Sequence, residues 1–140
     1  HFESRVCRNT DALLEIFASF DVRGTFFVLG WVAERFPELL RRIHAAGHEL
    51  ASHSHVHDLV YDMSPEAFRD DLRRARSAIE DAAGVAVAGY RAPSYSITNR
   101  SLWALDILVN EGYAYDASIY PVRHDRYGIP GWPRHIHKVH

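Results

Sequence analysis

The sequence predicts an α/β fold in which short strands alternate with helices around a parallel sheet. Segments of helical and strand-like periodicity follow one another along the chain, beginning with a helix and ending with a strand. This order gives consecutive right-handed βα units, whose strands lie parallel. The connections between segments are short, which suits a closed β/α barrel as well as an open sheet.

The first half of the chain predicts a helix, a strand, a helix and a strand in turn. Apolar residues recur at helical spacing over residues 10–20, after Asn9 or Thr10 as a cap. Residues 25–29 form a short apolar run that ends at a glycine, which indicates a buried strand. A helical pattern over residues 31–46 also ends at a glycine, and the strand-like residues 48–52 follow it.

The second half repeats this order. Ser64 as a cap and Pro65 as the first helical residue begin a helix that continues to residue 83 and stops before a glycine. The remaining elements follow: a strand over residues 85–90, a helix from residue 98 or 99 to 111, and a short strand over residues 113–115. After Pro121 the pattern is that of a loop.

Composition limits the class of protein. The 140 residues are enough for one domain or part of one, and 47% of them are apolar. The net charge is −2 without a basic block, so we expect no nucleic-acid partner. No apolar run reaches the roughly 20 residues of a membrane span, and the one cysteine excludes an internal disulfide framework. The compartment, cytoplasmic or cell envelope, stays open.

Three histidines lie within five residues directly after the strand-like residues 48–52, at His53, His55 and His57. Neutral imidazole is the commonest side-chain ligand of transition metals, so the cluster is a candidate metal site. A solvated, histidine-rich loop is the alternative. The zincin motif does not fit, because it needs a glutamate beside the first of two histidines four residues apart and Ser54 stands there.

Two further polar clusters follow the next two strands. Residues 91–95 come after the third predicted strand, and residues 116–118 come after the fourth. Carboxyl ends of parallel strands share one face, where such folds place their chemistry, so the three clusters predict a single site. Each also has a plainer interpretation: Arg91 as a surface residue, Pro93 as a loop breaker, Asp116 as a cap and the nearby tyrosines as core or rim aromatics.

The combination of motifs resembles the NodB-homology polysaccharide deacetylases, carbohydrate esterase family 4. His53-Ser54-His55-Val56-His57 matches the family's His-[Ser/Thr]-x-x-His motif, and Arg91-Ala92-Pro93 matches its Arg-x-Pro motif. Residues 112–121 and 127–130 are most similar to the branch associated with exopolysaccharide and exosortase loci. The resemblance covers residues 5 to 135.

The resemblance implies a distorted (β/α) barrel and a metal-dependent hydrolase that removes N-acetyl groups from a polysaccharide. It implies a divalent metal, most often Zn²⁺, on His53 and His57, with Ser54 supporting the loop and His55 outside the metal's ligand set. The implied catalytic residues are Arg91, which orients an aspartate, and Ser94, whose backbone N–H holds the oxyanion. Pro93, Tyr95 and Asp116 are the implied substrate-binding residues.

Two departures from the family pattern matter. No aspartate pair precedes residues 25–29, although the family takes its third ligand and general base from such a pair. Asp70-Asp71 is the one Asp-Asp sequence, and its place on a charged helix predicts solvated surface. The family's Leu-x-His motif is also absent. We therefore expect residues 1–140 to be a partial domain without its first and last strands, inactive by itself.

Two other functions are compatible with the motifs. Relatives in the same superfamily hydrolyse small amides or cyclic ureides with the same metal chemistry. A non-catalytic carbohydrate-binding remnant would keep the barrel and lose the base. The motifs do not decide between these functions and polysaccharide deacetylation.

Overall fold

The computed structural model describes residues 5–139 and contains one parallel sheet of four strands in the order β1-β2-β3-β4. The α/β prediction is thereby confirmed. The helices and strands are α1 (Val6–Ser19), β1 (Thr25–Val28), α2 (Gly30–Arg35), α3 (Pro37–Ala45), β2 (Glu49–Ser52), α4 (Pro65–Ala83), β3 (Gly89–Tyr90), α5 (Trp103–Asn110) and β4 (Tyr115–Asp116). Two 3₁₀ turns, η1 (Val60–Asp62) and η2 (Pro93–Tyr95), follow β2 and β3. No helix in this part of the chain is long and apolar enough to cross a membrane.

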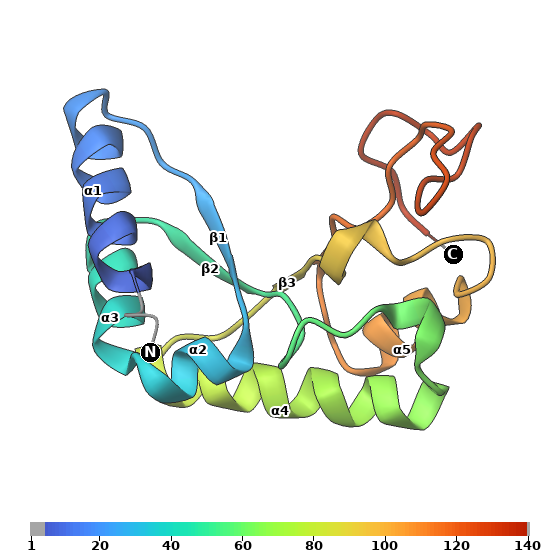
Figure 1. The fold of residues 1–140 in the computed structure, drawn as a ribbon, viewed down its shortest axis with the longest axis horizontal. Coiled ribbons are helices and arrows are strands. Elements are labelled where there is room, and N and C mark those ends of the chain that lie inside the picture. Colours follow the sequence, from blue (N-terminus) through green and yellow to red (C-terminus); the bar gives the residue numbers. More distant parts are fainter. Residues whose placement is uncertain (1–4, 140) are drawn as a thin grey trace.

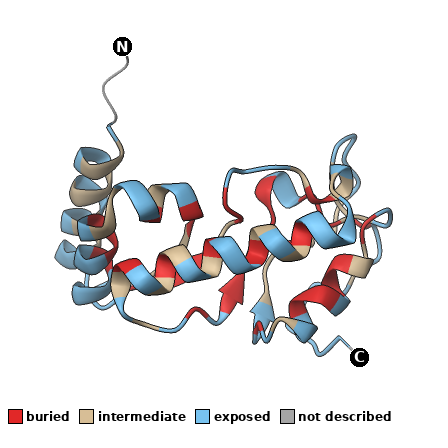
Figure 2. Cartoon of the chain, turned by 90° about the horizontal axis from the view of Figure 1, so that it is seen from below, coloured by how far each residue is buried: buried red, intermediate tan, exposed pale blue. Residues whose placement is uncertain are grey.

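Helix α4 is the base on which the sheet and helices α2, α3 and α5 pack. It runs along most of the length of the molecule, with α1 and α3 near one end and α5 near the other (Figure 1). Its N-terminus is capped as predicted, because the Ser64 Oγ accepts the Ala67 N–H at 3.1 Å. Figure 2 shows buried and exposed positions alternating along it. The buried stripe consists of Phe68, Leu72, Ala75, Ile79 and Ala82.

One predicted helix is two helices. The pattern over residues 31–46 predicts a single element, but α2 ends at Arg35 and α3 begins at Pro37. Proline has no N–H to continue the helix, and its ring pushes the preceding residue out of helical conformation. Phe36 accordingly has φ −132° and ψ 55°. The break lets α3 turn back along α1, where Arg42 donates to Asp11 at 2.9 and 3.1 Å.

The last two strands are shorter than the sequence predicts. Of residues 85–90 only Gly89 and Tyr90 pair in the sheet, because the Val87 N–H donates to the Glu80 side chain on α4 instead. The final strand is Tyr115–Asp116 and not residues 113–115. Asp116 therefore lies in a strand, level with Tyr90 of β3, and does not follow one.

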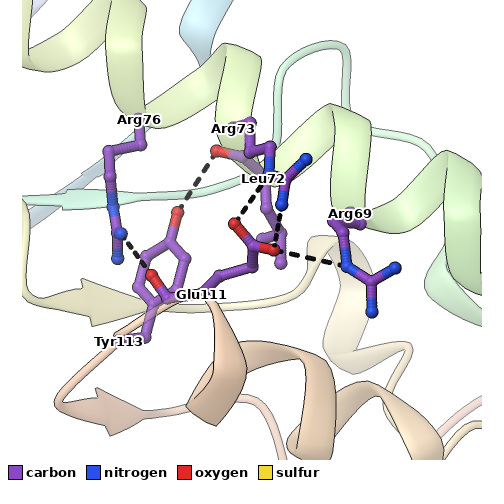
Figure 3. A network of polar contacts seen from close by, with 6 residues as sticks. All are labelled: Arg69, Leu72, Arg73, Arg76, Glu111 and Tyr113. Carbon is purple, nitrogen blue, oxygen red and sulfur yellow. Dashed lines mark hydrogen bonds and ion pairs between the residues drawn. The ribbon is translucent and has the colours of Figure 1, made fainter.

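A polar clamp of three arginines and one glutamate joins α4 to the end of α5 (Figure 3). The Glu111 carboxylate accepts from Arg73 at 2.8 and 2.9 Å and lies 3.3 Å from Arg69. Arg76 donates to the Glu111 backbone carbonyl, and its guanidinium carbon is 3.8 Å from the centroid of the Tyr113 ring. These contacts hold α5, and the strand β4 that follows it in the chain, against α4.

We expect Glu111→Gln to destabilise the protein in a pH-dependent way. The Arg73 guanidinium lowers the pKa of Glu111 from its ordinary 4.5, so the clamp's contribution is present above pH 4.5 and lost as the pH falls through the lower folded value. An exposed pair contributes about 0.2–1 kcal/mol. Urea unfolding at pH 7 should show this loss. A variant as stable as the wild type at pH 7 would mean that the clamp does not stabilise the fold.

Candidate functional site

His53 and His57 lie together at the carboxyl end of β2. Their ring centroids are 5.2 Å apart and their planes are inclined by 75°. The His53 Nδ1 is 2.6 Å from the Arg91 backbone carbonyl. Because a carbonyl only accepts, Nδ1 carries the proton and the lone pair is on Nε2. Burial lowers the pKa of His53 against the opposing effect of its hydrogen bond to the Arg91 carbonyl, and this favours the neutral ring that can bind a metal.

The loop that carries the pair is held in an unusual conformation. Ser54 and His57 have φ values of 67° and 68°, in the left-handed region that residues with a Cβ rarely adopt. The N–H groups of Gly30 and Trp31, at the start of α2, donate to the carbonyls of Ser54 and His55 at 3.0 and 3.2 Å. The Ser54 hydroxyl lies 2.9 Å from the Tyr90 hydroxyl, in the core. The loop is therefore tied to α2 and to β3.

The middle histidine, His55, points away from the other two. Its side chain is buried and packs against Gly30, where a Cβ would come within 2.4 Å of the His55 Nδ1. Its Nε2 is 3.8 Å from a Glu34 carboxylate oxygen on α2. His55 thus belongs to the packing beneath the loop and not to the pair.

Asp71 is a functional candidate that the sequence analysis missed, and its prediction as solvated surface is wrong. Both its carboxylate oxygens accept the His55 N–H, at 3.0 and 3.1 Å, and the side chain is half-buried. Burial raises its pKa against the opposing effect of this hydrogen bond. The neighbouring Asp70 is exposed, as predicted. A signal was present: Asp71 lies three residues after Phe68 and four before Ala75, beside the buried stripe of α4.

Arg91 joins the ends of three strands. Its backbone N–H donates to Ser52 of β2, and its Nε donates to the carbonyl of Ala117, just after β4, at 3.0 Å. Its guanidinium carbon lies 4.3 Å from the centroid of the Phe27 ring of β1. Arg91 is only partly exposed, and its guanidinium contacts Ala117 and Phe27.

Asp116 faces the Arg-x-Pro segment. Its Oδ2 accepts the Ser118 N–H at 3.0 Å and its Oδ1 accepts the Ser118 hydroxyl, which in turn accepts the Ala92 N–H at 2.7 Å. Burial raises the pKa of Asp116 to about 6, although Ser118 and Arg91 favour the ionised form. The carboxylate therefore titrates close to neutral pH.

The residues after Arg91 form the turn η2. Pro93 is buried, whereas Ser94 and Tyr95 are exposed and have φ values of 50° and 53°. The Tyr95 ring lies 5.5 Å from that of Tyr120 at an angle of 27°, and 5.5 Å from that of Tyr127. We call Tyr95, Tyr120 and Tyr127 the tyrosine cluster. The last two were not predicted as site residues, because nothing local to them shows that their loop returns to η2.

The histidine pair supplies some, but not all, of the ligands that a metal site needs. Within residues 5–139 no group of three histidine, cysteine, aspartate or glutamate side chains is placed to share an ion. Zinc sites in enzymes have three protein ligands and an open position. His53 and His57 can supply two of these ligands.

A parallel α/β sheet with paired imidazoles and an Arg-x-Pro turn at its carboxyl edge has the organisation of a β/α domain with its functional site at the strand ends. The polysaccharide deacetylase family profile matches residues 2–113. The chain therefore belongs to the polysaccharide deacetylases, the NodB-homology or family 4 carbohydrate esterases, as the motifs predict. The narrower assignment to the exopolysaccharide-associated branch stays a prediction.

Sequence and structural relatives agree with this assignment. The chain is 31% identical over 107 residues to a peptidoglycan deacetylase of Helicobacter pylori, covering 76% of this chain and 36% of that protein. It superposes with a TM-score of 0.68 on a family 4 carbohydrate esterase from Streptomyces lividans in complex with acetate, at 27% identity, covering 76% of this chain and 54% of the other. A family 4 pseudoenzyme from Bacillus anthracis matches with a TM-score of 0.67 at 26% identity, covering 74% and 36%. The chain thus spans about a third to a half of the length of these relatives.

Proposed function

We propose that the natural protein carrying this chain removes N-acetyl groups from an acetylated polysaccharide, with a divalent metal, Zn²⁺, held in part by His53 and His57. The observation that carries the proposal is the pair itself: two imidazoles 5.2 Å apart, one with Nδ1 fixed by a backbone carbonyl. Such a carbonyl partner sets the tautomer and orientation of metal-binding histidines. The family's deacetylases support the choice of reaction.

The bound metal would polarise the acetamide carbonyl and lower the pKa of the attacking water. His53 and His57 would each bind it through the lone pair of a ring nitrogen. In this proposal the third ligand and the general base come from carboxylates outside residues 5–139, because no described residue joins the pair. By itself the 140-residue chain would then be an incomplete, inactive part of a NodB domain.

The Arg-x-Pro turn would bind the reacting group. Ser94 lies at the exposed tip of η2, where its backbone N–H would donate to the oxyanion that develops on the acetamide oxygen. Buried Pro93 fixes this turn beneath the substrate. Arg91, with its Nε occupied by Ala117, would use its other N–H groups to orient the catalytic carboxylate.

Tyr95 and Asp116 would contact the sugar. The tyrosine cluster presents aromatic rings at the end of the site, and Tyr95 and Tyr120 are 36% and 45% exposed. Exposed tyrosines offer an apolar face and a hydroxyl, which suits the apolar faces and hydroxyls of a sugar ring. The Asp116 oxygens that accept from Ser118 retain lone pairs for a sugar hydroxyl.

A non-catalytic carbohydrate-binding protein is the second candidate. The similarity to a family 4 pseudoenzyme favours it, as does the lack of a third ligand among the described residues.

The test is acetate release from an N-acetylglucosamine oligomer by the full-length natural protein. We expect release that stops after chelation and returns with zinc, whereas the 140-residue chain releases none. Release that survives chelation would contradict the metal mechanism. Oligomer binding without any release would favour the second candidate, and release from a small amide but not from the oligomer would favour a small-amide hydrolase.

A further inference from the structure

We propose that Asp71 is a positioning residue for the histidine pair: through the His55 N–H its carboxylate fixes the loop on which His53 and His57 are placed. This inference rests on the proposed metal-binding role of the pair. Asp71 would touch neither the metal nor the substrate. It would act through the backbone of the loop, from the long helix α4 to the strand end of β2.

The His55 N–H donates directly to both carboxylate oxygens of Asp71. Both oxygens of Asp71 lie within 3.1 Å of the His55 nitrogen, across sixteen residues of sequence. A hydrogen bond to an ionised acceptor is stronger than a neutral one. Among the described residues, no other side chain or carbonyl accepts from the His55 N–H. Asp71 is therefore the one anchor for this donor in residues 5–139.

The position of this anchor explains why the loop keeps its shape. His55 lies between Ser54 and His57, both in the left-handed region. Such conformations persist only where the surroundings over-determine them. The N–H groups of Gly30 and Trp31 donate to the carbonyls of Ser54 and His55, but they do not bind the His55 N–H. Asp71 accepts this N–H, so the loop is held by α2 through its carbonyls and by α4 through the His55 N–H.

Removal of the Asp71 carboxylate should therefore change the relative positions of the His53 and His57 rings. Without an acceptor the His55 N–H is left unpaired in a half-buried site, and the adjacent peptides can rotate to reach water. His53 is kept in place by Val28 and Arg91, whereas His57 lies at the far end of the loop. The expected change is a wider and more variable separation of the two rings, with the fold retained.

The experiment measures zinc affinity in the full-length natural protein, by competition with a chromophoric chelator well below the unfolding temperature. The variants are Asp71→Ala and Asp71→Asn. Asp70→Ala and Asp70→Asn are matched controls, because Asp70 is the exposed neighbour on the same helix and carries the same charge. Outer residues that orient metal ligands typically contribute roughly 10–100-fold in affinity. We expect a loss in this range for Asp71→Ala, a smaller loss for Asp71→Asn, and less than a twofold change in both controls.

A second readout separates positioning from stability. A purely structural role would lower the melting temperature of the metal-free protein and leave the zinc-induced rise unchanged, and this result would overturn the proposal. Wild-type affinity in both Asp71 variants, or an equal loss in the Asp70 controls, would also overturn it. If Asp71→Ala does not fold, Asp71→Asn against Asp70→Asn decides in the same way. Failure of the wild-type protein to bind zinc would instead contradict the proposed function.

Discussion

Replacing His53 with alanine in the full-length natural protein is expected to weaken zinc binding by more than about 100-fold and to abolish acetate release at the same zinc concentration. His53 is the better fixed of the two proposed ligands, with its Nδ1 committed to Arg91 and its ring neutral. Removing a direct ligand should cost more than the roughly 10–100-fold typical of residues that only orient ligands. Calorimetric zinc titration and the acetate assay measure the two effects.

His44→Ala is the matched control for this variant. His44 is an exposed histidine on α3, and it contributes nothing to the loop of residues 53–57. We expect it to bind zinc as the wild type does. If His53→Ala binds zinc with the same affinity as His44→Ala, the histidine pair is not the metal site.

The largest expected loss of stability follows from Phe68→Ala. The Phe68 side chain is fully buried on α4 and packs edge-to-face with Tyr90 and Trp103, at centroid distances of 5.8 and 5.7 Å. A buried phenylalanine replaced by alanine typically costs about 3–5 kcal/mol, because apolar contacts are lost and a cavity remains. Urea unfolding of the natural protein would measure this loss.

Phe20→Ala serves as its control. Phe20 is 76% exposed after the end of α1, and substitutions at such positions usually change stability by less than about 0.5 kcal/mol. A similar change for the two phenylalanines would mean that α4 is not the base on which the β3 side of the sheet packs.

The sequence predicts the fold class and helix α4 because their signals are local, whereas α1 begins at Val6 and the predicted caps Asn9 and Thr10 lie inside it. Helix α4 is correct at both ends, since Ser64 and Pro65 mark its start and Gly84, at φ 71°, follows its last residue. The break at Pro37 was also encoded locally, although the apolar pattern over residues 31–46 concealed it. The lengths of β3 and β4 depend on which partners the backbone finds, so residues 85–88 could not be excluded from the sheet in advance.

The residues of the candidate site also fall into those that local sequence signals predict and those that depend on tertiary contacts. The motif residues His53, His57 and Arg91 meet at the strand ends, as parallel topology requires. Asp71 and the tyrosine cluster were missed because their roles depend on tertiary contacts, between α4 and the loop of residues 53–57 and between η2 and the C-terminal loop. A charged residue on a helix surface is usually solvated, and only the approach of the His55 N–H changes this for Asp71.

In the proposed site His53 and His57 bind one metal ion and His55 does not. Zinc K-edge X-ray absorption of the full-length natural protein counts imidazole ligands directly, because their rings give characteristic outer-shell scattering. We predict two imidazoles in the wild type and one in any zinc that His53→Ala retains at high metal concentration. A wild-type site with no imidazole, or the same imidazole count in the variant, would mean that the histidine pair does not hold the metal.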